Sequence, residues 1–383
     1  MDKFKTIFVG SILSEFGLAN NKGVSAAATQ WSYGLIKSLI QNGCKVTNLS
    51  HVWNSSFPKG KLLPGSKDDF SSEFNTKYVK YLNIKGIRNL SLFREKFKAF
   101  KILIEEFFIP DVMLFYNAYP FNIRLAEKIK TLFPRIKLIL LVLDYSDPEP
   151  DDWINFKRDS KVFDGCVFLS AWAFENAPVE NKIHIDAGWD GNIIQDSHNE
   201  NEDSETVFLY AGKMEKYGGI QNIVNAIKLI PKSLNDLRFE FYGNGLSTDL
   251  IELAETDSRV FIHGFVSEEK LEEAFRKADV FLSPLDLSVS DNRMVFPSKI
   301  MNYLRYQKPI LASRSEGISK EYDNVLFYPS SNNENGWRSL MLEFSSKNEK
   351  EYKTVAHKSR KLLSKKTWDK HVERMTDFIN DLD

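Results

Sequence analysis

The chain has 383 residues, more than one ordinary hydrophobic core holds, so two domains are expected. Lys and Arg total 51 against 52 for Asp and Glu, so net charge gives no sign of a nucleic-acid or anionic-membrane partner, although a local basic patch stays open. The two cysteines, Cys44 and Cys166, lie in apolar segments, and this usage excludes a disulfide framework and favours a reducing compartment.

Targeting and membrane signals are weak. The first nine residues form a short strand pattern rather than a signal peptide, and the longest apolar run, 138–143, is far short of the roughly 20 residues that a membrane span needs. We therefore expect a cytoplasmic protein, either soluble or attached peripherally to the inner face of the membrane.

The first half predicts strands alternating with helices. A strand over 4–9, a helix over 26–41 and a strand over 45–49 indicate a parallel sheet, and residues 54–77 are polar enough to predict a surface excursion. The pattern continues with a helix over 94–107, a strand over 111–116, a helix ending at 133 and strands over 137–143, 164–170 and 182–186.

An acidic polar segment near residue 200 predicts a linker, after which the same unit repeats. The expected elements are strands over 206–211, 238–242, 260–263, 280–282, 309–312 and 325–328 and helices over 220–229, 249–255, 268–276 and 297–304. We thus predict two tandem doubly wound α/β domains, with bounds 1–195 for the first, 196–205 for the linker, 206–355 for the second and 356–383 for a C-terminal helix whose apolar stripe packs back toward the first.

The loops after the strands of the second domain carry lysines and glycines. Because the carboxyl ends of parallel strands meet at one edge, these loops face one cleft, and their lysines suit a diphosphate. The candidates on these loops are Lys213, Lys216, Gly243, Asn244, Gly264, Phe265, Val266 and Arg293.

The stretch after Phe296 is the one around which this site is organised. Pro297 predicts a helix start, and the spacing places Lys299 and Asn302 on one face, next to Ser298 at the helix N-terminus. A cation and an amide at this place predict binding of a phosphate and a ribose. The alternative is a solvated helix face with a surface lysine.

In the first domain, Gly23 lies in a long loop just ahead of a helix, where backbone amides can meet a phosphate. Asp144 and Asp147 follow a buried strand at the ligand edge, so they are either site acids or helix caps.

The sequence lacks the motifs that are typical of several classes of enzyme. Clustered histidines and Cys-x-x-Cys are missing, so we expect no metal and no cofactor, and neither a phosphate-binding P-loop nor a serine-hydrolase elbow is present. The Gly-Asn-Gly run at 243–245 half resembles a dinucleotide fingerprint, but Thr248 stands where the third glycine belongs.

The second half resembles glycosyltransferase family 4. The resemblance is carried, in order, by Tyr-Ala-Gly-Lys at 210–213, Gly-Gly-Ile at 218–220, Phe-Tyr-Gly-Asn-Gly at 241–245, His-Gly-Phe-Val-Ser at 263–267, Ala-Asp-Val-Phe-Leu-Ser-Pro at 278–284, and Phe-Pro-Ser-Lys at 296–299 with Lys-Pro at 308–309. It implies a B-type glycosyltransferase fold, an acceptor-side first domain, a donor-side second domain, retention of configuration and no required metal.

Residue by residue, the resemblance implies a diphosphate ligand at Lys213 and contacts of the base with backbone at 264–266. Asn302 stands where the family usually has a ribose-binding Glu, Met294 where it has an earlier Glu, and Gly218 where it has a second basic residue. Lys216, Arg293 or Lys299 would then cover the missing charge. It also places Gly23 beside the diphosphate and the segment from Asp144 to Pro148 near the transferred sugar.

The resulting expectation is a metal-independent, retaining glycosyltransferase. It would move a sugar from a nucleoside-diphosphate-sugar to a glycan or lipid-linked acceptor in cell-surface glycan assembly, with Asp144, Asp147, Lys213 and Lys299 as catalytic candidates. Two alternatives stay open: a catalytically silent sugar-nucleotide-binding subunit, and a sugar-nucleotide epimerase of the same fold.

Overall fold

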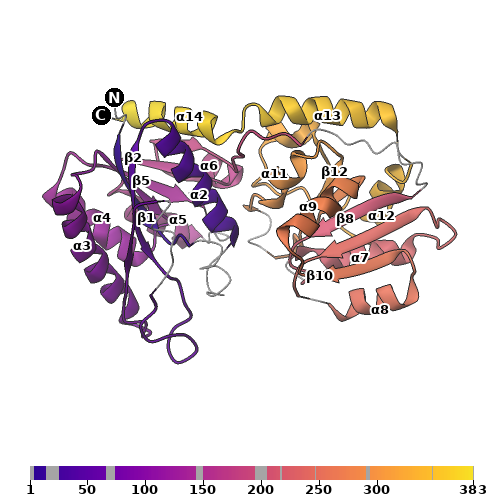
Figure 1. Cartoon of the computed structure of the whole chain (residues 1–383), viewed down its shortest axis with the longest axis horizontal. Helices are drawn as coiled ribbons and strands as arrows, with labels where there is room; N and C mark the ends of the chain where they lie inside the picture. The colour runs from indigo at the N-terminus through magenta and orange to yellow at the C-terminus, as the bar shows by residue number, and fades with distance from the viewer. Residues whose placement is uncertain are drawn as a thin grey trace. The chain divides into compact units, whose positions relative to one another are not determined.

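The computed structural model describes residues 4–13, 26–65, 74–143, 150–194, 205–215, 218–245, 247–289, 294–346 and 348–382. The chain forms two compact units, which Figure 1 shows in chain colours. Unit 1 comprises Met1–Leu169, Ala173–Asp190 and Thr367–Asp383, and unit 2 comprises Ser170–Trp172 and Gly191–Lys366. The chain therefore returns to unit 1 for its last residues.

Unit 1 is built on a sheet of seven parallel strands in the order β3-β2-β1-β4-β5-β6-β7. The strands are β1 (Lys5–Gly10), β2 (Lys45–His51), β3 (Thr76–Val79), β4 (Val112–Tyr116), β5 (Lys137–Val142), β6 (Gly165–Phe168) and β7 (Lys182–His184). The expected surface excursion over 54–77 is wrong at its end, where β3 begins. This strand is short and mostly half-buried, so it lacks the apolar run that marks the central strands.

Helices cover both faces of this sheet. They are α2 (Ala26–Gln41), α3 (Arg88–Glu106), α4 (Pro120–Leu132), α5 (Pro150–Ser160), α6 (Ala171–Asn176), which begins in unit 2, and α14 (Trp368–Asn380). In Figure 1, α3 and α4 lie together on one face, whereas α2 and α14 pack on the other. The core between α2, α14 and the sheet buries Leu35, Ile36, Leu114, Val372 and Met375.

The C-terminal segment forms two helices, where one was expected. The first, α13 (Glu349–Leu363), belongs to unit 2, and α14 packs on unit 1. The Trp368 indole packs edge-on against Trp31, with ring centres 5.5 Å apart. A Cβ at Gly34 of α2 would overlap the Trp368 ring, so this glycine makes room for the indole. The predicted return of the C-terminus to the first domain is confirmed.

Unit 2 repeats the architecture with six parallel strands in the order β10-β9-β8-β11-β12-β13. They are β8 (Thr206–Ala211), β9 (Leu237–Tyr242), β10 (Val260–Gly264), β11 (Val280–Ser283), β12 (Ile310–Ala312) and β13 (Leu326–Phe327). In both units the strand order reverses beside the first strand, between β1 and β4 and between β8 and β11. Such a reversal is the point at which ligands of doubly wound sheets bind.

The helices of unit 2 are α7 (Ile220–Leu229), α8 (Thr248–Thr256), α9 (Glu268–Lys277), α11 (Lys299–Leu304), the 3₁₀ helix η3 (Lys320–Asn324), α12 (Glu334–Glu343) and α13. Successive side chains of β11 point to opposite faces of the sheet, and the helices that they contact therefore lie in two layers. Val280 and Leu282 join the core under α7, α8 and α12, while Phe281 contacts Phe275 of α9 and Tyr303 of α11. Both faces of the sheet are thus covered, as two doubly wound domains require.

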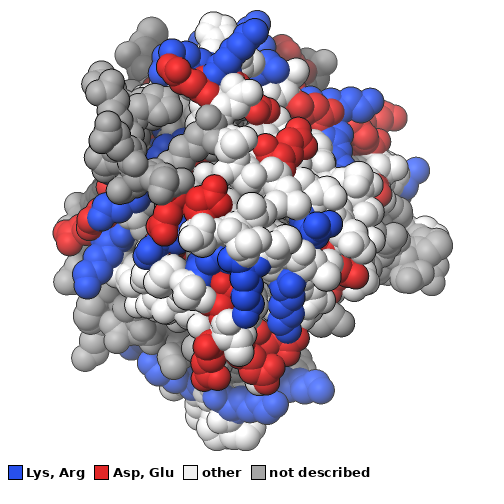
Figure 2. Space-filling model, turned by 90° about the vertical axis from the view of Figure 1, so that its right-hand side faces the viewer, with Lys and Arg blue, Asp and Glu red and all other residues white. Residues whose placement is uncertain are grey.

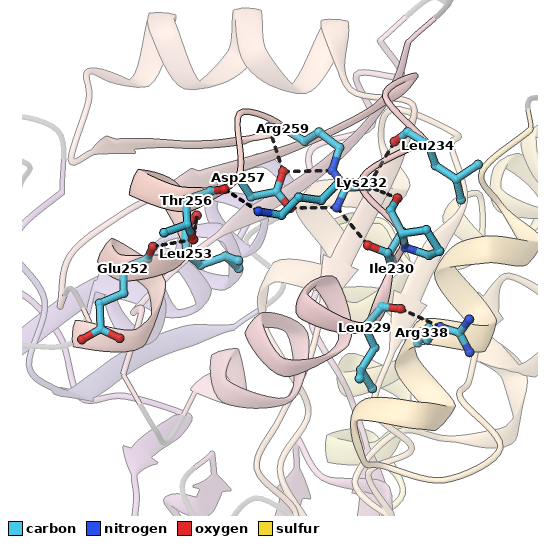
Figure 3. A network of polar contacts seen from close by, with 11 residues as sticks. Leu229, Ile230, Lys232, Leu234, Glu252, Leu253, Thr256, Asp257, Arg259 and Arg338 are labelled. Carbon is cyan, nitrogen blue, oxygen red and sulfur yellow. Dashed lines mark hydrogen bonds and ion pairs between the residues drawn. The ribbon is translucent and has the colours of Figure 1, made fainter.

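A buried network, shown in Figure 3, closes the amino-terminal edge of the unit 2 sheet. Arg259, just before β10, is 5% exposed and donates to the carboxylate of Asp257 at 2.7 Å. It also donates to the carbonyl oxygens of Ile230, Pro231 and Leu234. These bonds satisfy the guanidinium and join the end of α7 to β10, at the edge opposite to the expected ligand site.

Two surface observations complete the fold. The face drawn in Figure 2 carries Lys and Arg interspersed with Asp and Glu, so no field of one sign covers it. Within the described ranges, no helix has the length and apolar character needed to cross a membrane.

Candidate functional site

The expected donor site lies where β8 and β11 end. Gly219 caps α7 in the left-handed conformation, with φ of 68°, and a Cβ on it would lie 2.6 Å from the backbone of Leu285. Only glycine allows this approach without strain. The loop after β8 is therefore packed directly against the loop after β11, at the reversal point of the sheet.

Backbone hydrogen bonds join the loops after β8, β9 and β10. The Gly212 amide donates to Tyr242 at 2.9 Å, the Met214 amide to Asn244 at 2.7 Å, and the Gly243 amide to Gly264 at 2.8 Å. A Cβ on Gly243, whose φ is 130°, would overlap the Gly212 carbonyl. The glycines predicted from the sequence thus set the close packing of this edge.

Lys299 lies beneath this edge rather than on the surface. Its side chain is half-buried, and its Nζ is 4.1 Å from the centre of the Tyr210 ring. A Cβ at Gly212 would come within 2.9 Å of the same Nζ. Burial lowers the pKa of Lys299 to about 7. Among the described residues no carboxylate pairs with it, so it is a cation, held under a glycine loop, that lacks a counter-charge.

Helix α11 is fixed by Tyr303. The Tyr303 hydroxyl accepts a hydrogen bond from the Ala211 amide at 2.9 Å, and its ring stacks on Phe281 with centres 4.4 Å apart. Desolvation raises the pKa of this hydroxyl, which stays protonated. Since Ala211 ends β8, this contact sets the position of Lys299 relative to the glycine loop.

The other candidates on α11 are exposed. Ser298 makes no side-chain capping bond, and Asn302 lies on the solvent side, whereas Ile300 and Leu304 are buried. The helix has only 6 residues, too short for its dipole to make an anion site. On this helix the half-buried Lys299 side chain turns toward Tyr210, whereas Asn302 lies on a solvated face.

The remaining described candidates border the same edge. Lys213 and Asn244 are exposed, and the Lys213 carbonyl accepts from the Tyr210 hydroxyl at 2.5 Å. The ring of Phe265, which follows β10, is 79% exposed, and Val266 beside it is half-buried. A large apolar ring left in solvent at a ligand edge offers a face to a flat partner.

Sequence reasoning missed the polar residues beneath the loop after β11. The Ser313 hydroxyl accepts from the Leu285 amide at 2.9 Å and donates to Asn332 at 2.7 Å. Ser283 is fully buried, and its hydroxyl has no partner among the described residues. These small polar side chains lie at the ends of strands, and that position is the only sequence signal that could have identified them.

The other sequence candidates, Gly23, Asp144, Asp147, Lys216 and Arg293, lie outside the described residues. In the part of the chain that the structure describes, no three His, Cys, Asp or Glu side chains gather as a metal site needs.

The chain is similar to known glycosyltransferases in part of its sequence and in its fold. Residues 205–342 match the family model described as glycosyl transferases group 1, which covers less than half of the chain. No curated protein sequence matches.

Solved structures match over nearly the whole chain at low identity. A glycosyltransferase from Rickettsia africae aligns with a TM-score of 0.69 and 12% identity over 99% of this chain and 98% of that chain. The HepE protein of Anabaena in complex with UDP and glucose gives 0.66 and 12%, over 99% and 100%. The catalytic domain of starch synthase IV from Arabidopsis thaliana, bound to ADP and acarbose, gives 0.65 and 11%, over 98% and 99%. The two-unit fold of this chain is the B-type glycosyltransferase fold.

Proposed function

We propose that the protein is a retaining glycosyltransferase. It would act in the cytoplasm without a metal, moving a sugar from a nucleoside-diphosphate-sugar to a hydroxyl acceptor in cell-surface glycan assembly. The observation that carries the proposal is Lys299, a half-buried cation without a described counter-charge under the glycine loop of the segment matched by the group 1 model. Neighbours of the same fold are in complex with UDP and with UDP-glucose, which supports a nucleotide-sugar donor.

In this proposal, the diphosphate supplies the missing negative charge. Its oxygens would accept hydrogen bonds from Lys299 and the exposed Lys213, and as the bond to the sugar breaks these lysines would stabilise the departing charge. Lys216 and Arg293, with Gly23 in unit 1, are proposed for the same group on sequence grounds alone.

The nucleoside is assigned to the loops after β9 and β10. The base would meet the backbone at Gly264 and Val266 and the ring of Phe265, with Gly243 and Asn244 bordering it. Asn302 and Ser298, exposed on α11, would bond the ribose. For unit 1 we propose that it holds a glycan or lipid-linked acceptor, with Asp144 or Asp147 contacting the sugar or the attacking hydroxyl, and that membrane association is peripheral.

One observation favours a second candidate, a sugar-nucleotide-binding protein without turnover. Met294 stands where the resemblance places a Glu, and its side chain is 4% exposed. The Ser170 hydroxyl donates to its carbonyl at 2.5 Å, which anchors the backbone there. A buried thioether cannot replace a carboxylate that contacts a donor sugar.

A donor-turnover assay separates these functions. UDP-, GDP- and ADP-sugars are incubated with the full chain without metal, and nucleoside diphosphate and free sugar are measured. A transferase releases both slowly from one donor, with the anomeric configuration retained, and Lys299→Met abolishes the release while the exposed control Lys270→Met does not. Binding without release would establish the silent protein, and conversion of the donor to an epimer would establish the epimerase.

A further inference from the structure

The ligand edge of unit 1 carries a second group of basic and aromatic side chains that the proposed donor site does not use. They come from the end of β2, from α3 and from the segment that enters α4. We call them the His51 cluster; its members are His51, Trp53, Arg88, Lys96, Tyr119 and Phe121. Because β2, β1 and β4 are neighbours in the sheet, the cluster lies beside the reversal point of strand order.

Two members of the cluster are buried without full hydrogen bonding. Lys96 is 0% exposed and His51 is 2% exposed, and the Nζ of the one and the Nε2 of the other have no partner among the described residues. His51 uses its Nδ1 to donate to the Gly10 carbonyl at 2.8 Å, which orients the ring. Both side chains meet Phe121, with Nζ 5.0 Å from the ring centre and the imidazole centre 5.3 Å away.

The burial of these groups also perturbs their titration. Desolvation lowers the pKa of Lys96 to about 7. The pKa of His51 is lowered by desolvation first and then by the nearby charges of Lys96 and Arg88. Like charges gathered with unbonded polar atoms at a ligand edge are typical of binding sites.

Above this buried pair lies a half-buried aromatic stack. Trp53 stacks on Tyr119 with centres 5.3 Å apart and an interplanar angle of 24°, and Tyr119 stacks on Phe121 at 5.4 Å. The Arg88 guanidinium lies 4.7 Å over the Trp53 ring, and the one side-chain hydrogen bond that it makes within the described ranges, to Ser56, is long at 3.4 Å. Most of its donors therefore have no partner among the described residues and can meet a ligand.

No described carboxylate balances the cluster. Arg88, Lys96 and His51 form no ion pair within the described ranges. A buried cation without a counter-charge is costly, whereas an anion placed beside it recovers part of that cost. A planar guanidinium holds carboxylates and phosphates in two-point contacts, and aromatic faces cover the apolar side of a ring.

We propose that the His51 cluster binds an anionic group, a carboxylate or a phosphate, carried by the sugar acceptor. Arg88 holds the anion, the faces of Trp53 and Tyr119 pack on the acceptor's sugar ring, and the charged form of Lys96 beneath them supplies positive potential, while the neutral His51 ring packs on Phe121. The inference rests on the proposed function, because it names the chemistry of that enzyme's acceptor.

The test is calorimetric titration of the full chain with three probes: glucuronate, glucose 6-phosphate and glucose. Both anionic probes or one of them should bind, and glucose should bind at least about tenfold more weakly, as expected for loss of a charge-assisted contact. A preference for glucuronate identifies a carboxylate, and a preference for glucose 6-phosphate identifies a phosphate.

Variants assign the binding to the cluster. Arg88→Gln and Lys96→Met should each weaken the preferred anionic probe by about tenfold or more. The control Arg94→Gln, exposed on the same helix, should bind as the wild type does. Lys96→Met removes a buried charge that has no partner in the part of the chain that the structure describes, so it should fold at least as stably as the wild type, and a loss of binding would not come from unfolding.

Titration with UDP, GDP and ADP in the same preparation separates the two proposals. Binding of one nucleotide without binding of any anionic probe, or equal binding of glucose and the anions, overturns the inference and leaves the proposed function standing. Unchanged affinity in Arg88→Gln also overturns it. Failure of all three nucleotides to bind the wild type counts against the proposed function itself.

Discussion

Replacing Lys96 by Met should make the protein more stable, and the gain should depend on pH. Lys96 is fully buried in unit 1 against Phe121 and has no hydrogen bond or ion pair among the described residues. Desolvation holds its folded-state pKa at about 7, while an unfolded lysine titrates near pH ~10.4. The folded state therefore binds a proton less tightly than the unfolded state does.

The sign of the pH dependence follows from this order. Below pH 7 the lysine is charged in both states, and the folded state carries the full cost of the buried charge. Between pH 7 and about 10.4 the unfolded state holds more protons, so wild-type stability rises with pH. At ~1.4 kcal/mol per pKa unit, the cost below pH 7 is roughly 3 to 5 kcal/mol.

The assay is thermal unfolding by calorimetry at pH 6 and pH 9.5, with hydrogen exchange in β1, β2 and β4 to assign the effect to unit 1. Lys96→Met should gain stability at pH 6 and lose most of that gain at pH 9.5. Lys98→Met, exposed on the same helix, is the matched control and should change little at either pH. A destabilised Lys96→Met at pH 6, or a gain independent of pH, would refute the reasoning.

Three further predictions concern unit 2. Affinity for the donor diphosphate should fall about tenfold per pH unit above pH 7, because the pKa of Lys299 is about 7 and the diphosphate binds the charged form of this lysine. Titration with the nucleotide at pH 6 and pH 8 measures this fall, and an affinity that does not change with pH contradicts it. Gly243→Ala should cost roughly 2 to 4 kcal/mol of unfolding free energy, because a Cβ at position 243 would overlap backbone. Gly264→Ala should cost only about 1 kcal/mol, because its Cβ would meet nothing and only the positive φ is strained. Equal losses of stability by calorimetry would count against the packing described. Arg259→Met should cost roughly 3 to 5 kcal/mol at pH 7 by leaving the Asp257 carboxylate buried and unpaired. Hydrogen bonding to Arg259 lowers the pKa of Asp257, so the pair stabilises the fold above the ordinary aspartate pKa, and this stabilisation is lost as pH falls through the folded-state pKa. The stability that Arg259→Met loses in urea unfolding should therefore shrink in acid. A loss of stability that does not depend on pH would argue against an ionic origin.

Local pattern was enough to predict most elements. The helix over 26–41 and the strand over 206–211 have the predicted bounds, because each is a long apolar repeat of one period with a clear break at its end. The doubly wound class followed from strict alternation of such segments. The order of strands did not, since it depends on pairing between residues far apart, and the structure supplies the position of β3 and β13 at the edges.

Short or irregular elements escaped prediction for identifiable reasons. Helix α12 is capped by Asn333, whose side chain accepts from the Gly336 amide at 3.0 Å, and this Asn- and Gly-rich start is typical of a loop. The break between α13 and α14 falls at 364–367, within a segment whose helical spacing hardly changes. Only the packing of Trp368 against Trp31 shows that the chain changes units there.

The candidate site was predicted by residue type but not by geometry. Lys299 was chosen for its charge and helix position, whereas its inward turn depends on Tyr210 and Gly212, far away in the sequence. The His51 cluster carries no motif. Its members are spread from β2 to α4, and only the sheet brings them together.

The central claim is that unit 2 binds a nucleoside diphosphate through Lys299. It is tested most directly by titrating the full chain, without metal, with UDP, GDP and ADP in wild type and in Lys299→Met, with Lys270→Met as control. We predict that one nucleotide binds the wild type and the control alike, and binds Lys299→Met at least about tenfold more weakly. Equal affinity in Lys299→Met, or binding of none of the three to the wild type, would contradict the account.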